Sequence, residues 1–209
     1  MTNKKTYHHG DLKNALIEAG IEILAKEGAH ALSLRKVAQR AGVSHAAPYA
    51  HFADKQAFFA AISTAGYQKV QERVEDVLRA YAKDPLRLLV HTGWEYVRFA
   101  LTEPEHFKIT FSGVVEKEQD YPALVEAAQT SFGLLKRVIR KCQRAKILRP
   151  GPTGLMAVSV WGAIHGFVTL SLEAQIPHTV LARRDWQKML IFTLSQMTLV
   201  PIPAGLLDE

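Results

Sequence analysis

The side chains best suited to chemistry in this sequence lie close together, between Ser33 and Lys55. The stretch mixes hydroxyl, imidazole and cationic groups, which donate hydrogen bonds to phosphate oxygens and to base edges. Along the whole chain, no Ser/His/Asp arrangement, paired-carboxylate spacing or phosphate-cradling glycine loop rises above chance. The pattern therefore indicates contact with a nucleic acid rather than bond-making chemistry.

A glycine divides this stretch into two helical halves. Apolar spacing predicts one helix over 33–41 and a second over 45–52, with Gly42 between them in the left-handed conformation that ends a helix. Val43 would fill the angle between the helices and Ser44 would cap the second one. In a helix-turn-helix of this kind, the second helix enters the major groove while the first crosses the backbone. Two helices joined at a glycine also occur in all-α proteins with no DNA-binding role, so the neighbouring residues must distinguish DNA binding from a purely structural turn.

Those neighbours resemble the TetR-type transcriptional repressors. The DNA-binding unit of that family ends in a valine-serine pair, an aromatic-rich tetrapeptide and a lysine that opens a long linking helix. In this chain the corresponding segments are Val43-Ser44, Tyr49-Ala50-His51-Phe52 and Asp54-Lys55-Gln56-Ala57-Phe58. The opening Tyr7–Leu12 and the later Trp161–Gly166 resemble the branch with a Trp-His-Gly carboxy-terminal domain.

The resemblance implies a set of residues that touch DNA from the two short helices and the start of the linking helix. They are Ser33, Arg35, Lys36, Ser44, His45, Ala46, Tyr49, His51 and Lys55. Ser33 alone is equally explained as a helix cap. The alternative for His45 and His51 is a solvated surface histidine. Leu34 and Phe52 are expected in the core.

One part of the family pattern is missing. Where the family often has Lys-Gly-Thr-Leu, this chain has His45-Ala46-Ala47-Pro48. The two alanines offer only apolar contact, and Pro48 must sit in the first turn of its helix. We therefore expect part of the specificity to come from DNA shape. The arm Lys4–His9 is either a minor-groove contact or a tail.

The later helices hold most of the bulky aromatic residues, which at helical spacing usually form core. The resemblance implies that this part also contains an apolar cavity for a small effector. The residues we expect there are Trp94, Phe107, Phe111, Trp161 and His165. Trp161 and His165 share a helix face as polar handles, although a core histidine bonded to a carbonyl explains His165 equally well.

The last two helices, about 152–175 and 183–199, are expected to form a homodimer as a four-helix arrangement. Gly162 and Gly166 lie four residues apart, which lets another helix come close. Two copies place two half-sites one helical turn apart on DNA. No metal or cofactor is expected, because neither Cys142 nor His91 has a clear ligand partner in the sequence.

Helical periodicity predicts an all-α fold of about nine helices. The first three, a helix over 11–27 and the two short ones, form a helix-turn-helix domain over 1–54. A helical-bundle domain for effector binding and dimerisation follows over 55–209. Its first helix is long, about 55–82, with Asp54 as its cap. Pro85 opens the next helix, and Pro122 opens another that extends to about residue 148.

Composition supports a globular protein in a reducing, cytoplasmic setting. The chain has 209 residues, 48% of them hydrophobic, a formal net charge of +6 and one cysteine. Its start, with Lys4 and Lys5 leading into polar residues, does not have the apolar core of a secretory signal. The apolar run from Leu155 to Leu172 approaches membrane-span length, but His165 within it favours a helix buried in protein.

Together these features predict a sequence-specific transcriptional regulator. We expect a homodimeric repressor that a small apolar or aromatic ligand releases from a palindromic operator, by swinging the long helix that starts at Lys55. An activator with the same DNA-binding unit and an all-α dimeric adaptor are the alternatives. An enzyme is not expected.

Overall fold

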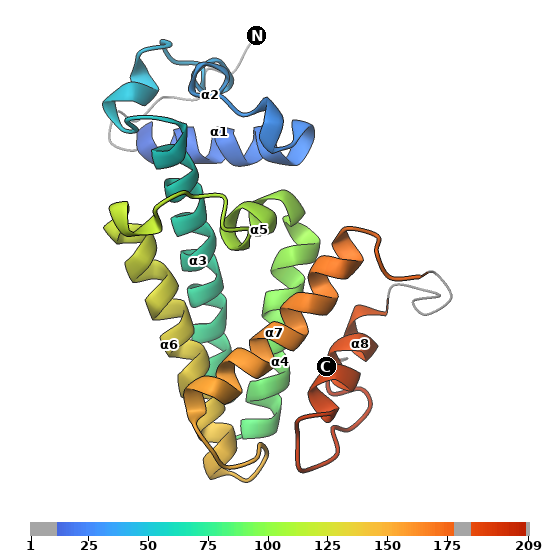
Figure 1. Ribbon diagram of the computed structural model, residues 1–209. Helices are drawn as coiled ribbons and strands as arrows, with labels where there is room; N and C mark the ends of the chain where they lie inside the picture. The colour runs from blue at the N-terminus through green and yellow to red at the C-terminus, as the bar shows by residue number, and fades with distance from the viewer. Residues whose placement is uncertain (1–11, 178–184, 208–209) are drawn as a thin grey trace. The chain divides into compact units, whose positions relative to one another are not determined.

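The computed structural model describes residues 12–177 and 185–207, and this part of the chain is helical. Figure 1 shows the eight α-helices. They are α1 Leu12–Glu27, α2 Leu34–Ala41, α3 Lys55–Ala80, α4 Pro85–Thr102, α5 Pro104–Phe111, α6 Pro122–Arg144, α7 Thr153–Leu172 and α8 Trp186–Ser195. The all-α class is confirmed, and one isolated antiparallel bridge joins Leu148 to Thr198. The described part holds eight α-helices rather than nine because 45–52 does not form one.

Helix ends follow the local signals that the sequence contains. The Asp54 carboxylate accepts the Ala57 amide at 2.8 Å, which confirms the cap of α3. Gly28 follows α1 at φ 77°, a backbone conformation that suits glycine. Asp84 caps α4, with Pro85 in its first turn. All of the Tyr7–Leu12 motif except Leu12, and the whole Lys4–His9 arm, lie outside the described residues. Helix α6 ends earlier than expected, at Arg144.

The chain packs as two compact units, and α3 contributes to both. Unit 1 comprises Met1–Gly66 with Glu105–Val125, and unit 2 comprises Tyr67–Pro104 with Glu126–Glu209. Packing therefore divides the chain within α3, whereas the sequence suggests a functional boundary after residue 54. That functional boundary stays a prediction.

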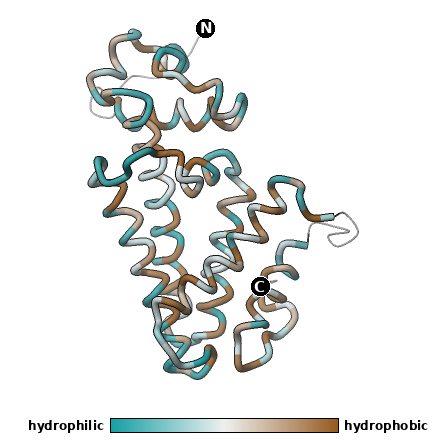
Figure 2. Tube along the Cα trace, in the orientation of Figure 1, coloured by the Kyte–Doolittle hydropathy of each residue, from teal (hydrophilic) through white to brown (hydrophobic). Residues whose placement is uncertain are grey.

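Unit 1 is built on an apolar core beneath the short helices. Figure 2 shows hydrophobic and hydrophilic residues alternating along α1 and α2, as expected for helices with one buried face. Phe58 is fully buried, and its ring would lie only 2.5 Å from a Cβ added at Gly20. Gly20 therefore lets α1 and α3 approach closely. The predicted core residues Leu34 and Phe52 are buried, at 6% and 3% exposure.

Within unit 1, α5 is fixed to the first half of α3 by polar contacts. The His106 ring donates from Nε2 to the Ile62 carbonyl at 3.0 Å, and the Ser63 hydroxyl donates to the Ile109 carbonyl at 3.2 Å. A Cβ at Gly66 would lie 2.0 Å from the Thr110 hydroxyl, so only glycine fits there. These contacts make α5 part of the same packed body as α1 and α2.

Unit 2 is centred on α4, α7 and α8, which pack on one another. Gly93 of α4 allows the approach, because an added Cβ would lie 3.0 Å from Leu190 and 3.2 Å from Ile164. On α3, the Gln71 side-chain amide donates to the Ala127 carbonyl of α6 at 2.7 Å. By length and composition alone, α7 is the one described helix that could cross a membrane.

Candidate functional site

The first half of the helix-turn-helix has the predicted geometry. Ser33 precedes α2 in an extended conformation, and its hydroxyl oxygen accepts the Lys36 amide at 3.3 Å, which confirms the cap. Gly42 ends α2 at φ 70°, ψ 29°, and this confirms the left-handed turn. Val37 and Ala38, on the inner face of α2, are fully buried. The phosphate contact of Ser33 stays a prediction.

The second half differs from the prediction. Only a 3-10 helix over Ala47–Ala50 follows the turn, and its cap residue is Ala46 with no side-chain hydrogen bond. The expected α-helix over 45–52 and the capping role of Ser44 are therefore wrong. Pro48 lies in the first turn as expected, and it has no N–H to donate to the carbonyl four residues earlier. Ala47 instead donates to the Ser44 carbonyl at 3.0 Å, one residue short of the α pattern.

The predicted DNA-contacting side chains lie almost entirely on the outside of unit 1. We call the exposed members the outer polar surface: Ser33, Arg35, Ser44, His45, Ala46, Tyr49, His51 and Lys55. Tyr49 is 59% exposed, so its ring and hydroxyl are accessible from solvent. The Lys55 ammonium lies 5.2 Å from the centre of the Phe59 ring. The outer polar surface thus offers donors and a flat aromatic side chain to an incoming molecule.

Lys36 is the exception, because α1 holds its ammonium. Lys36 hydrogen-bonds Glu27, and this bond lowers the pKa of the Glu27 carboxyl. Arg40 also forms salt bridges to α1, 3.3 Å from Glu22 and 3.6 Å from Glu27. Among the described residues, Arg35 makes no salt bridge. Arg35 is therefore the more available cation at the start of α2.

The five predicted effector residues are divided between the two units. Phe107 and Phe111 belong to unit 1, where their ring centres lie 5.0 Å apart and Phe107 is 2% exposed. Trp94, Trp161 and His165 belong to unit 2. A shared role for the five residues therefore stays a prediction, and Phe107 has the burial of a core residue.

In unit 2 the two polar handles meet a residue that the sequence pattern did not single out. Trp161 Nε1 donates to the Tyr96 hydroxyl oxygen at 3.1 Å, and the same oxygen lies 2.8 Å from His165 Nδ1. We call Tyr96, Trp161 and His165 the Tyr96 cluster. Tyr96 falls on the buried stripe of α4, and this periodicity was the only signal that could have found it.

Burial keeps the Tyr96 cluster uncharged. Desolvation raises the pKa of the Tyr96 hydroxyl and lowers the pKa of His165. An indole N–H can only donate, so the Tyr96 oxygen accepts from Trp161. The other ring nitrogen of His165, Nε2, lies 3.4 Å from the Thr169 hydroxyl. The cluster can orient a neutral or weakly polar ligand group.

Comparisons with known proteins agree with this architecture. Residues 16–62 match the family described as bacterial regulatory proteins, tetR family, and residues 89–192 match the tetracyclin repressor-like carboxy-terminal domain. The HTH-type transcriptional regulator AcrR of Shigella flexneri is 24% identical over 186 residues, covering 83% of this chain and 82% of AcrR.

Solved structures show the same fold. A protein of unknown function from Rhodococcus sp. RHA1 superposes with a TM-score of 0.75 at 26% identity, covering 92% of this chain and 96% of its own. A TetR family transcription regulator from Marinobacter aquaeolei VT8 has a TM-score of 0.66 at 19% identity, with 89% and 95% coverage. Trp161–Gly166 lies within the residues that match the carboxy-terminal domain family. Membership of the branch with a Trp-His-Gly carboxy-terminal domain stays a prediction.

Proposed function

Because the chain belongs to the tetR family of bacterial regulatory proteins, we propose that it is a repressor that binds a palindromic operator as a homodimer and leaves it when a small ligand binds. The observation that carries this proposal is the outer polar surface. Its polar and cationic side chains point outward beside the Gly42 turn, over a core of apolar residues. Repression takes place at the DNA, which puts the protein in the cytoplasm.

The local geometry suggests how the contacts divide. Ser33 and Arg35 lie at the start of α2, where backbone N–H groups and a free cation favour a phosphate. His45, Tyr49 and His51 would reach the groove and its edges from the 3-10 turn. Such a short turn presents few side chains to base edges, so DNA shape should carry part of the specificity. Lys36 contributes less, because Glu27 holds it.

The dimer is proposed to form through α7 and α8. One face of α7 carries exposed Leu155 and Val158, at 68% and 51%, and α8 exposes Phe192 at 64%. A Cβ added at Gly162, on that same face of α7, would meet nothing within 4 Å. An apolar face with room for a close helix is suited to a second copy of the same pair, in a four-helix arrangement.

The ligand is proposed to act in unit 2, where the Tyr96 cluster provides polar groups among apolar helices. A small apolar or aromatic effector fits such a lining. Binding would favour a conformer in which α3 is displaced, so that the two DNA-binding surfaces lose the spacing of the operator half-sites. Lys55, the first residue of α3, lies where that displacement begins. This mechanism requires no catalytic step and no cofactor.

A binding assay tests the proposal. Fluorescence anisotropy with duplexes from the region flanking the protein's own coding sequence should show nanomolar affinity that falls steeply with salt, and much weaker binding to a random duplex. Arg35→Ala should weaken binding, whereas Arg79→Ala, which removes an exposed cation of unit 2, should not. Equal affinity for all duplexes, or no loss with Arg35→Ala, would contradict operator recognition. A reporter gene then separates repression from activation.

A further inference from the structure

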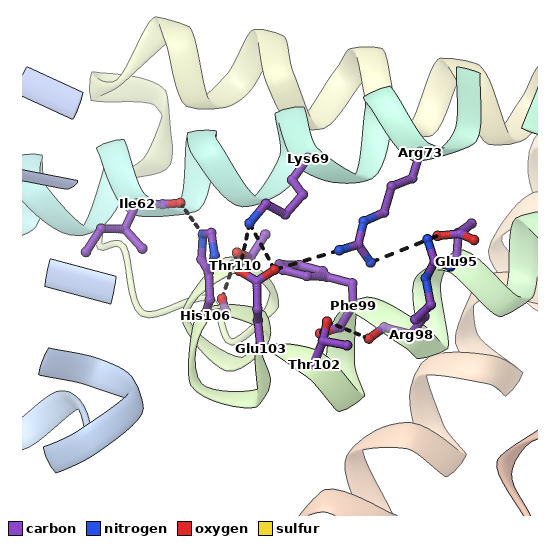
Figure 3. Close-up of polar contacts among 10 residues, drawn as sticks. All are labelled: Ile62, Lys69, Arg73, Glu95, Arg98, Phe99, Thr102, Glu103, His106 and Thr110. Atoms are coloured by element: carbon purple, nitrogen blue, oxygen red, sulfur yellow. Dashed lines mark hydrogen bonds and ion pairs between the residues drawn. The ribbon is translucent and has the colours of Figure 1, made fainter. Parts of the chain in front are cut away.

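Five charged side chains from α3, α4 and Glu103, the residue that follows α4, form a compact group in unit 2 (Figure 3). We call it the α3–α4 charge cluster: Lys69, Arg73, Glu95, Arg98 and Glu103. Its members are three cations and two carboxylates. The cluster by itself therefore carries one positive charge that its own carboxylates do not neutralise.

Glu103 is hydrogen-bonded at short range, whereas Glu95 is ion-paired and its buried Oε2 has no hydrogen bond within the described part of the chain. Lys69 Nζ donates to the two Glu103 oxygens at 2.9 and 2.8 Å. Arg98 Nη2 lies 2.7 Å from Glu95 Oε2, on the same helix. Glu95 is 13% exposed and Glu103 is 24% exposed, so neither reaches far into solvent. Each carboxylate thus lies closer to another cation of the cluster than to Arg73.

Arg73 is the third cation, and it is left without a short partner. Its nearest carboxylate oxygens are 3.7 Å away on Glu103 and 4.0 Å away on Glu95, beyond hydrogen-bond distance. Its buried Nη1 has no hydrogen bond within the described part of the chain. The guanidinium carbon lies 5.7 Å from the centre of the Phe99 ring. A buried guanidinium nitrogen without a hydrogen-bond acceptor is unfavourable unless an acceptor joins it.

We propose that Arg73 binds the carboxylate of a small organic acid. A guanidinium presents paired N–H groups that match the two oxygens of a carboxylate. A monoanion cancels the single excess charge of the cluster, whereas a phosphate dianion would leave a negative charge in a half-buried place. On its inner side the guanidinium packs against the fully buried Phe99 ring, so an acid can reach Arg73 only from the outer side. The Arg73 side chain retains 21% exposure and that of Arg98 beside it retains 50%, so an acid can approach the exposed part of the guanidinium from solvent, while Nη1 itself is buried.

This inference names the chemical class of the effector, and in that respect it rests on the proposed function. Arg73 lies on α3, the same continuous helix that begins at Lys55 in unit 1. A bound carboxylate therefore acts on the helix whose displacement is proposed to control DNA binding. The apolar body expected of the effector is retained, and an acidic head group is added to it.

Calorimetry and thermal shift on the full-length protein, without DNA, test the site. The probes are straight-chain carboxylates from acetate to decanoate and benzoate, each compared with the corresponding amide, and inorganic phosphate. At least one carboxylate should bind at least about tenfold more tightly than its amide. Arg73→Gln should remove that preference, and Arg73→Lys, which keeps the charge but not the paired N–H groups, should retain part of it. Arg79→Gln on the same helix is the matched control and should change nothing.

Three results would overturn the assignment. They are the absence of any carboxylate preferred over its amide, equal preference in wild type and Arg73→Gln, and phosphate binding as tight as that of the best carboxylate. The first comparison uses only wild-type protein, so a poorly folded variant cannot obscure it. Operator anisotropy on the same preparations separates the two proposals, because loss of DNA recognition leaves the carboxylate measurement intact.

Discussion

The outer polar surface of unit 1 and the Tyr96 cluster of unit 2 use polar residues in opposite ways. On the outer polar surface, side chains such as Tyr49 and His51 extend into solvent above an apolar core. In the Tyr96 cluster, Trp161 and His165 are satisfied by one buried hydroxyl. A polar group on the surface can therefore be removed without stranding a partner, whereas each group in the cluster is needed by another.

This difference separates recognition from stability. Substitutions on the outer polar surface should change affinity for DNA and leave the folded state intact. Substitutions in the Tyr96 cluster should change the free energy of unfolding first, and ligand response along with it. Four measurements test this difference between the two regions.

The largest effect is expected from the double substitution Tyr49→Ala with His51→Ala. It removes two proposed DNA contacts from each half-site, and we expect operator affinity to fall about 100-fold. Both side chains are exposed, so the free energy of unfolding should stay within about 0.5 kcal/mol of wild type. Anisotropy and urea denaturation measure the two quantities. A variant whose stability fell in step with its affinity would show that this surface is structural.

A smaller effect, on the free energy of unfolding rather than on DNA affinity, is expected from Tyr96→Phe. The substitution leaves the Trp161 N–H and His165 Nδ1 without their shared oxygen, and we expect the free energy of unfolding to drop by about 1–3 kcal/mol. Tyr49→Phe removes the same atom from an exposed position and should have no effect on unfolding. Urea denaturation of both variants gives the comparison, and equal stabilities would argue against a structural role for the cluster.

Next in size is the contrast between the two neighbouring cations of α2. Arg35→Met should reduce the slope of log affinity against log salt by about 1 for each phosphate that Arg35 neutralises in the wild-type complex. Lys36→Met should reduce it less, because the ammonium is already hydrogen-bonded to Glu27. Anisotropy titrations at several salt concentrations provide the slopes. Equal reductions would mean that DNA draws Lys36 away from α1.

The smallest expected effect concerns pH. Burial lowers the pKa of His165, so the unfolded chain, with a histidine pKa of about 6.5, takes up a proton before the folded protein does. The stability due to neutral His165 is complete above that value and is lost as the pH falls below it towards the lower folded pKa. His165→Gln should flatten this dependence between pH 7 and 5. Thermal unfolding of wild type and His165→Gln across that range measures the difference. Parallel profiles would exclude His165 as the cause of the pH dependence.

Features set by neighbours in the chain could be read from the sequence. The Ser33 cap, the Gly42 turn and the Asp54 cap each depend on residues within three or four positions. The buried Leu34 and Phe52 follow from apolar periodicity. In the same region the prediction of an α-helix over 45–52 is wrong, because apolar periodicity does not register that Pro48 has no N–H for the Ser44 carbonyl.

Features set by distant parts of the chain could not be read in this way. Tyr96 lies 69 residues from His165, and only the packing of α4 on α7 brings them together. The charge cluster likewise joins residues of two helices whose register is invisible in the sequence. The placement of Phe107 in unit 1 depends on α5 being fixed to α3 by His106 and Thr110, a contact between segments some 44 residues apart.

The shared helix α3 has a consequence for dissecting the molecule. A fragment cut after residue 54 would lack Phe58 and Ile62, two fully buried side chains of unit 1. A fragment cut after Gly66 would keep them but would still lack α5, which belongs to the same compact body. Chimaeras that exchange sensing parts between relatives must therefore transplant a discontinuous piece, and a junction in the middle of α3 must preserve its helical phase.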